Sequence, residues 1–234
     1  MNRSATSLDQ AQTAPSLAAM TSKLARAAAM VVLMMVGLFI VTGIGQDPLQ
    51  YLHTQQDYGA ILLKNPPVLR GAIGLDNLFI VLYSTMFLTL GVTLWQRTGP
   101  KVLLLAALGL MAVSGLMDLL ENMHFLTMIA AALQGVSISQ AQIELQVWES
   151  LVKFHVSYLG LFLLGFALPT ETRLEKALCF AFRWVQLPIG LLIYLVPPAL
   201  AKLLVFGRFT FFFLALMAIG SIFQQRKFDS SARL

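Results

Sequence analysis

Cysteine is almost missing from this chain, and charged residues are rare. Its 234 residues include a single cysteine, Cys179, which excludes an internal disulfide and any cysteine-based metal cluster. Only 12% of the residues are charged, against roughly 25% in a typical soluble domain. A soluble protein with so few charges would lack the polar surface that covers a core. The composition therefore excludes the soluble classes and indicates an integral membrane protein.

Motifs that bind nucleotides or nucleic acids are also missing. The stretch GAIGLDN at residues 71–77 lacks the Gly-x-Gly-x-x-Gly spacing, and no strand is expected before it. The 16 Lys and Arg are scattered between apolar runs and form no basic stripe. We therefore expect no nucleic-acid partner.

Histidine is scarce as well. His53, His124 and His155 could join Asp118, Glu121 or Glu149 as metal ligands by residue type. However, no His-x-x-x-His spacing occurs, and neither His124 nor His155 shares a helical face with a neighbouring acid. We therefore expect packing or interfacial histidines, with no metal and no other cofactor.

Apolar residues make up 58% of the chain and gather in six runs, each about long enough to cross a bilayer. The sequence predicts an all-α bundle of about six transmembrane helices, at residues 24–44, 75–95, 102–123, 148–168, 177–197 and 203–223. Together they form a single transmembrane domain over residues 23–225, between a disordered cytoplasmic tail at 1–22 and a second cytoplasmic tail at 226–234. The fifth span is the weakest, because it contains Arg183, Gln186 and Pro188, and its start could instead lie along the membrane surface.

The Lys and Arg residues predict the orientation of the bundle. With a cytoplasmic N-terminus, eleven of them lie in inside segments and four in outside segments. We therefore expect both termini in the cytoplasm and a location in the cell's inner, or plasma, membrane. The first outside loop, residues 45–74, carries an Asp-Pro helix start and an Asn-Pro-Pro stop, which predict one or two short interfacial helices.

Polar side chains interrupt the third span in the stretch MDLLENMHF, residues 117–125. Counting about 20 residues from the inner edge of spans 2, 3 and 4 places Asp76, Glu121 and Glu149 at one level, near the outer edge. Lipid-facing carboxylates are costly, so these polar faces should turn towards one another. We predict a shared polar pocket in the outer leaflet, lined by Asp76, Asn77, Tyr83, Asp118, Glu121, Asn122, Glu149 and Lys153, with Glu149 and Lys153 paired one helical turn apart.

Two interpretations of the acidic residues remain open at this point. Asp118 and Glu121 are candidate catalytic groups, because one turn apart and partly buried they could act in acid–base chemistry. Alternatively, they belong to a structural network that sets the register of the helices.

The function hypotheses follow from these two interpretations. The first is a non-catalytic membrane protein that binds a lipid or an apolar small molecule, or serves as a subunit of a membrane complex. The alternatives are a membrane-embedded enzyme acting on a lipid-like substrate through carboxylate acid–base chemistry, and a small transporter. Membrane lipids and a membrane protein are the expected partners.

Overall fold

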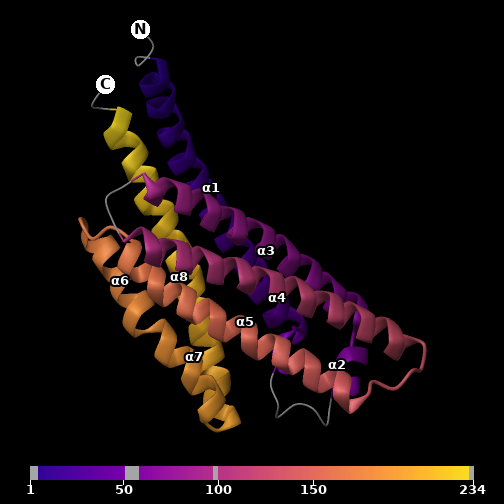
Figure 1. Ribbon diagram of the computed structural model, residues 1–234. Coiled ribbons are helices and arrows are strands. Elements are labelled where there is room, and N and C mark those ends of the chain that lie inside the picture. Colours follow the sequence, from indigo (N-terminus) through magenta and orange to yellow (C-terminus); the bar gives the residue numbers. More distant parts are fainter. Residues whose placement is uncertain (1–4, 51–57, 97–99, 232–234) are drawn as a thin grey trace.

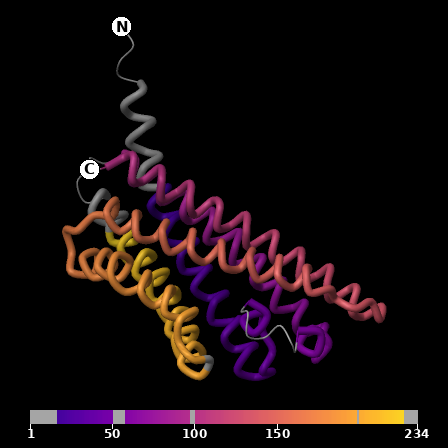
Figure 2. Tube along the Cα trace, turned by 60° about the horizontal axis from the view of Figure 1, so that its bottom comes forward, coloured from indigo at the N-terminus to yellow at the C-terminus, as the bar shows by residue number. Residues whose placement is uncertain are grey.

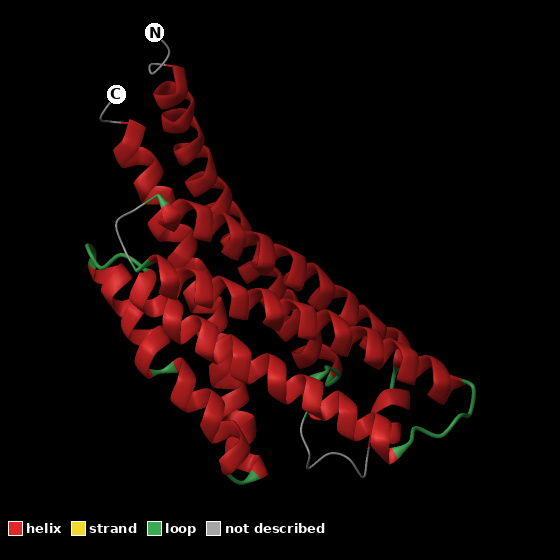
Figure 3. Cartoon of the chain, viewed as in Figure 1, coloured by secondary structure: helices red, strands yellow, loops and turns green. Residues whose placement is uncertain are grey.

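Helices account for nearly all of the structure. The computed structural model describes residues 5–50, 58–96 and 100–231, with side chains over 17–50, 58–96, 100–197 and 199–225. The described residues contain no strand (Figure 3). The elements in chain order are α1 (Ala5–Thr42), the 3₁₀ helix η1 (Asp47–Leu49), α2 (Tyr58–Leu63), α3 (Pro66–Trp95), α4 (Lys101–Leu133), α5 (Gln140–Ala167), α6 (Arg173–Trp184), α7 (Gln186–Leu195) and α8 (Pro198–Ser231).

Six segments are long and apolar enough to cross a membrane, which is consistent with the predicted polytopic helical membrane protein. The fifth, Arg173–Leu195, is made of α6 and α7 together. The outward faces of the helices carry large exposed apolar side chains, as lipid contact requires; examples are Ile40, Leu88, Val102 and Leu203.

The six spans form a closed ring. α1 lies between α3 and α8, α4 lies between α3 and α5, and the α6–α7 pair contacts both α5 and α8 (Figures 1 and 2). α1 begins and α8 ends at the same end of the bundle, which we call the terminal end (Figure 1). The opposite end carries η1, α2 and the α4–α5 loop, and we call it the α2 end. Because the chain passes along the bundle an even number of times, α8 ends at the end where α1 begins.

Several helices extend beyond the predicted spans. α3 begins at Pro66 instead of residue 75, because Asn65 caps it by accepting the backbone N–H of Val68 and the two prolines fit its first turn. α4 continues to Leu133, following the apolar run beyond residue 123. α5 begins at Gln140 with a capping box from Ser139.

Helix α1 begins at Ala5, so it includes most of the segment 1–22 that the sequence predicts to be a disordered tail. Thr21 and Ser22 are buried, where Thr21 donates to the Thr89 hydroxyl at 2.9 Å and Ser22 donates to the Gly220 carbonyl at 2.6 Å. Burial against α3 and α8 holds this part of α1 in place. The division into one domain and two cytoplasmic tails stays a prediction.

The fifth span is broken in two. α6 ends at Trp184 and α7 begins at Gln186, two residues before Pro188, where proline is tolerated in the first helical turn. α6 does not lie separately from the bundle, since Leu178, Cys179 and Phe182 are buried against its neighbours. The Arg183 Nε donates to the Gly165 carbonyl of α5 at 2.9 Å, which supplies a partner for its charge.

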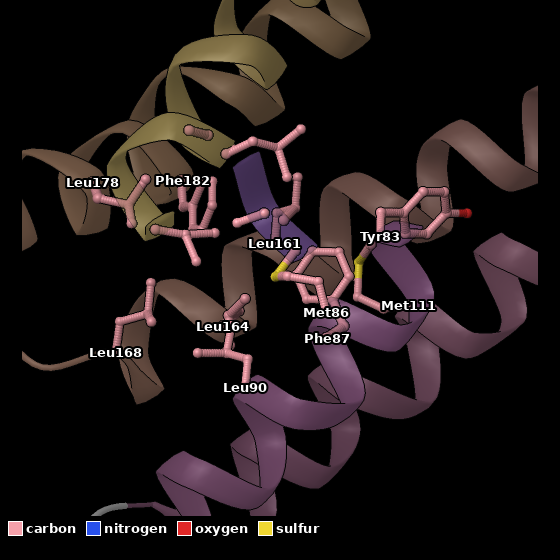
Figure 4. Close-up of a cluster of buried hydrophobic side chains, with 14 of the residues drawn as sticks. Tyr83, Met86, Phe87, Leu90, Met111, Leu161, Leu164, Leu168, Leu178 and Phe182 are labelled. Carbon is pink, nitrogen blue, oxygen red and sulfur yellow. The ribbon is translucent and has the colours of Figure 1, made fainter. Parts of the chain in front are cut away.

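Two apolar clusters fill the bundle. The larger lies towards the terminal end, where residues such as Met86, Leu90, Met111 and Leu164 pack together (Figure 4). The smaller lies at the α2 end and joins η1, α2, the start of α3, the end of α4 and the start of α5; Leu49, Ile73 and Phe125 belong to it. The polar residues singled out in the sequence lie between these clusters along α3, α4 and α5.

The loop between α1 and α3 contains short helices, as predicted: η1 begins with Asp47-Pro48, and α2 ends just before Asn65. Both contribute buried residues to the smaller cluster, namely Leu49, Tyr58 and Leu62. They therefore pack against the bundle, and their position at a membrane surface stays a prediction. His53 lies outside the described residues.

Candidate functional site

Lys153 lies at the centre of a buried ionic cluster between α4 and α5. Its Nζ is 2.7 Å from Asp118 Oδ1 and also bonds Glu121 Oε2, so one ammonium group serves two carboxylates. The other Asp118 oxygen, Oδ2, accepts the Tyr83 hydroxyl of α3 at 2.7 Å. Tyr83 and Lys153 are thus the partners of Asp118, and together they tie three helices to one point.

Close backbone packing positions this cluster. Gly115, one turn before Asp118, faces α3 at a point where a Cβ would lie 2.9 Å from Ser84 Oγ and 3.3 Å from the Tyr83 hydroxyl. A larger residue at position 115 would therefore displace the side-chain oxygens of Ser84 and Tyr83. The glycine brings Tyr83 within reach of Asp118.

Glu121 is the most enclosed acid of the site, with 0% of its side chain exposed. Besides Lys153, it accepts hydrogen bonds from Ser150 Oγ, from Gln146 Nε2 at 3.3 Å and from Gln50 Nε2 at 3.2 Å. Gln146 in turn accepts the Tyr58 hydroxyl of α2 at 2.8 Å. This chain of bonds joins the loop after α1 to α4 and α5.

Asp76 and Asn77 of α3 contact α4 at Asn122, the residue that follows Glu121. The Asn122 Nδ2 donates to Asp76 Oδ2 at 2.8 Å and to Asn77 Oδ1 at 2.9 Å. Asn122 Oδ1 is buried and has no hydrogen-bond partner among the described residues. Asp76 therefore differs from Asp118 and Glu121 in that its bonded partner within the described chain is a neutral amide.

We call these linked residues the polar layer: Gln50, Tyr58, Asp76, Asn77, Tyr83, Asp118, Glu121, Asn122, Gln146, Ser150 and Lys153. It includes seven of the eight residues predicted to share a site, and the predicted meeting of α3, α4 and α5 is what the contacts show. Glu121, Asn122 and Gln146 have no exposed surface, so their polar atoms do not line an opening. The layer is packed where the sequence predicts a pocket.

The predicted Glu149–Lys153 pair is wrong. Lys153 turns towards the buried acids of α4, because an unpaired buried carboxylate costs far more than one that reaches water. Glu149 instead lies 3.0 Å from Nδ1 of His124, with side chains 18% and 20% exposed. This pair forms the rim of the layer.

The site also lies at a different depth along the helices from the one predicted, which was near their outer edge. The estimate ended the third span at residue 123, whereas α4 continues to Leu133 and places Asp118 near its middle. A polar layer at that level lies between the two apolar clusters. Its depth in a membrane stays a prediction.

A second ion pair lies beside the polar layer. Arg208 of α8 is 1% exposed, and its Nη2 donates to Asp47 Oδ1 at 3.1 Å. Its guanidinium carbon lies 4.1 Å from the centroid of the Phe154 ring, a cation–π arrangement. The pair connects η1 to α8 beside the polar layer.

Burial affects the ionisation of two titratable groups in the first loop, Asp47 and Tyr58. It raises the pKa of Asp47, while the positive charges of Arg208 and Lys153 act in the opposite direction. Burial also raises the pKa of Tyr58, and the negative charges of Glu121 and Glu149 add to the effect. The Tyr58 hydroxyl therefore keeps the proton that it donates to Gln146.

The histidines show packing and rim contacts. His155 Nδ1 lies 2.7 Å from the Leu151 carbonyl, and its ring stacks on Tyr194 with centroids 5.3 Å apart. Within the described part of the chain, no three His, Cys, Asp or Glu side chains are arranged to hold a metal ion.

Sequence reasoning missed Gln50, Tyr58, Ser150 and the Asp47–Arg208 pair. Arg208 offered a signal, because it interrupts the apolar run VFGRFTFFF and a buried arginine requires a partner. Gln50 and Tyr58 offered none, since their role depends on how the loop folds back onto the bundle.

A cavity of about 500 Å³ opens at the terminal end, away from the polar layer. Its walls come from the end of α3, the start of α4 and the end of α5, and the lining residues are Leu94, Pro100, Lys101, Leu104, Phe166, Ala167, Leu168, Pro169, Thr170 and Glu171. Seven of the ten lining residues are apolar, but several of these are buried, and polar atoms make up most of the exposed lining.

No known family model matches the chain, and neither does any curated protein or solved structure.

Proposed function

We propose that this polytopic membrane protein binds a membrane lipid in the cavity at the terminal end, and that the polar layer holds the helices that form the cavity. The observation that carries the proposal is the cavity itself. Its volume of about 500 Å³ lies in the usual range of ligand pockets, about 300–1,000 Å³. The exposed ring of Phe166 suits an acyl chain, and Lys101 and the mainly polar exposed lining suit a phosphate headgroup.

Neighbouring charges support an anionic headgroup. Lys101 is exposed, with Nζ 4.9 Å from the centroid of the Trp95 ring, so its ammonium lies near an aromatic side chain of the kind found at membrane interfaces. Arg183 packs its guanidinium 4.1 Å from the centroid of Phe166, a residue that lines the cavity. Glu171 also lines the cavity.

The polar layer favours lipid binding over the two alternatives. An enzyme that used Asp118 or Glu121 would need a carboxyl group within reach of substrate, whereas Glu121 is fully buried and Asp118 is bonded to Lys153 and Tyr83. A transporter would need a path past the apolar clusters on either side of the layer. The contacts fit better with a structural role, in which the polar layer holds the helices together.

Lipid retention after gentle detergent extraction tests the proposal. In native mass spectrometry we expect bound phospholipid on the wild type. Lys101→Gln should weaken its retention about fivefold, because a basic residue near a membrane surface contributes about 1 kcal/mol. Ala167→Phe, which fills the cavity, should remove the bound lipid.

Lys202→Gln is the matched control, since Lys202 is an exposed lysine on α8 at the α2 end. It should retain lipid as the wild type does. Equal retention in all four proteins would show that the lipid lies elsewhere and would refute the cavity as the site.

We also propose that the terminal end faces the cytoplasm of a plasma membrane. Among the residues with described side chains, this end holds most of the Lys and Arg, including Lys23, Arg26, Lys101 and Arg173, whereas the α2 end holds Lys64, Arg70, Lys202 and Arg208. Cytoplasmic loops carry this excess.

Thiol labelling tests that orientation. Val136 is exposed in the α4–α5 loop at the α2 end, so Val136→Cys in a Cys179→Ala background should react with an impermeant reagent added to intact cells. Reaction only after lysis would reverse the orientation. The background alone, without Val136→Cys, measures unspecific labelling.

A further inference from the structure

The polar layer holds more acids than bases. Among the residues that the structure describes, the layer contains three carboxyl groups, from Asp76, Asp118 and Glu121, and one ammonium group, that of Lys153. The neighbouring Asp47–Arg208 pair balances itself. With every acid ionised, the layer would carry a surplus of negative charge between two apolar clusters. Such a charge is costly enough that a buried carboxyl group takes up a proton instead.

Asp76 is the carboxyl group that lacks a cation. Lys153 bonds Asp118 and Glu121 directly, whereas Asp76 receives a hydrogen bond from the Asn122 amide. The charged groups that act on Asp76 are Asp118 and Glu121 from α4 and Lys153 from α5; on its own helix, Tyr83 turns its hydroxyl to Asp118. Two of these three neighbouring groups are acids and one is a base.

Asn122 supplies the second observation. Its Oδ1 is fully buried without a donor, next to an Nδ2 that donates to both Asp76 and Asn77. The amide orientation is fixed by these two donated bonds, so Asp76 accepts through Oδ2. A protonated Asp76 can keep this bond, because a carboxylic acid retains one carbonyl oxygen as an acceptor and carries the proton on the other oxygen.

The packing leaves a larger cation little room on the Asn122 side of Asp76. Asn122 and Glu121 have no exposed surface, whereas Asp76 is 9% exposed, so water can reach Asp76 from its other side. A proton adds no heavy atom and needs no space.

We propose that Asp76 binds one exchangeable proton, taken from water, while its Oδ2 keeps the hydrogen bond from Asn122, and that this proton reduces the negative charge of the polar layer. This proton site does not depend on lipid binding at the terminal end. It makes the stability of the helix packing sensitive to pH.

Infrared difference spectroscopy on the protein in lipid bilayers tests the proposal. At neutral pH the wild type should show the carbonyl stretch of a protonated, non-aqueous carboxyl group, shifted to lower frequency in D₂O. Asp76→Asn should lose this band and still fold, because Asn keeps an oxygen that can accept from Asn122. Glu144→Gln, an exposed acid on α5, is the matched control and should keep the band.

Thermal unfolding gives an independent measure. A proton bound in the folded state and released on unfolding stabilises the fold at low pH, and this stabilisation declines as pH rises. The melting temperature of the wild type should therefore fall with increasing pH more steeply than that of Asp76→Asn.

Three results would overturn the proposal: no carboxyl band in the wild type, an unchanged band in Asp76→Asn, or a band that disappears when Na⁺ replaces choline at constant pH. The last would show that a metal cation occupies the site. If Asp76→Asn fails to fold, Asn122→Ser decides instead. It should shift the frequency of the band, because the carboxyl group changes its hydrogen-bond partner, and an unshifted band would refute the assignment.

Discussion

Lys153→Met is expected to leave very little folded protein in the membrane. The substitution keeps a long side chain but removes the ammonium group that bonds Asp118 and Glu121. Removing one partner of a buried ion pair costs about 3–5 kcal/mol, a large part of a total stability of about 5–15 kcal/mol. Fluorescence-detected size-exclusion chromatography of detergent extracts, followed by thermal unfolding of any monodisperse fraction, measures the effect.

A rescue experiment separates lost charge balance from lost packing. Adding Glu121→Gln and Asp118→Asn to Lys153→Met removes the carboxylates that were left without a cation, and neutral replacement of a whole buried ion cluster is often tolerated. The triple variant should recover part of the yield. Lys202→Met, at an exposed lysine of α8, should behave as the wild type does. If Lys153→Met were as harmless as Lys202→Met, the polar layer would not hold the helices together.

Asp118→Ala should lower the melting temperature clearly, with a loss of about 2–3 kcal/mol. It removes a charged acceptor and leaves the buried Tyr83 hydroxyl without its partner. Asp118→Asn keeps the shape and one acceptor oxygen for Tyr83, so its loss should be about 1 kcal/mol. Melting temperature and folded yield, measured side by side for both variants, give the comparison.

His124→Ala is the control for this series. His124 pairs with Glu149 on the partly exposed rim, where an ion pair contributes about 0–1 kcal/mol, so the variant should be mild. If Asp118→Ala were no worse than His124→Ala, the acid would be only a solvated side chain. If Asp118→Asn folded normally but lost an assayed activity that His124→Ala retained, the acid–base hypothesis would replace the structural one.

Much of the fold could be predicted from the sequence because membrane helices follow simple rules. A bilayer core of about 30 Å requires about 20 apolar residues, so six apolar runs indicate six spans. The gap between spans 5 and 6 and the weakness of span 5 were also visible, through Pro197, Pro198 and Pro188. Helix ends were less predictable, because local caps such as Asn65 and Ser139 extend helices beyond their apolar part.

The site was predicted in its membership more than in its arrangement. Residues on one helical face must turn towards partners in an apolar solvent, and this rule brought together Asp76, Asp118 and Lys153. It could not decide which carboxylate Lys153 bonds, since Glu149 on its own helix and Glu121 on the next satisfy the same rule. The folded bundle decides, because Glu121 is fully enclosed while Glu149 lies at the rim.

The sequence by itself predicted apolar surroundings, the number of spans and the helices that carry polar faces. These features depend on composition and on the 3.6-residue period alone. Only the tertiary structure decided that the first loop folds back, that Gln50 and Tyr58 join the layer, and that Arg208 finds Asp47. Those contacts link residues far apart in the chain. Their geometry depends on how six helices pack at once, and no local pattern of residues encodes it.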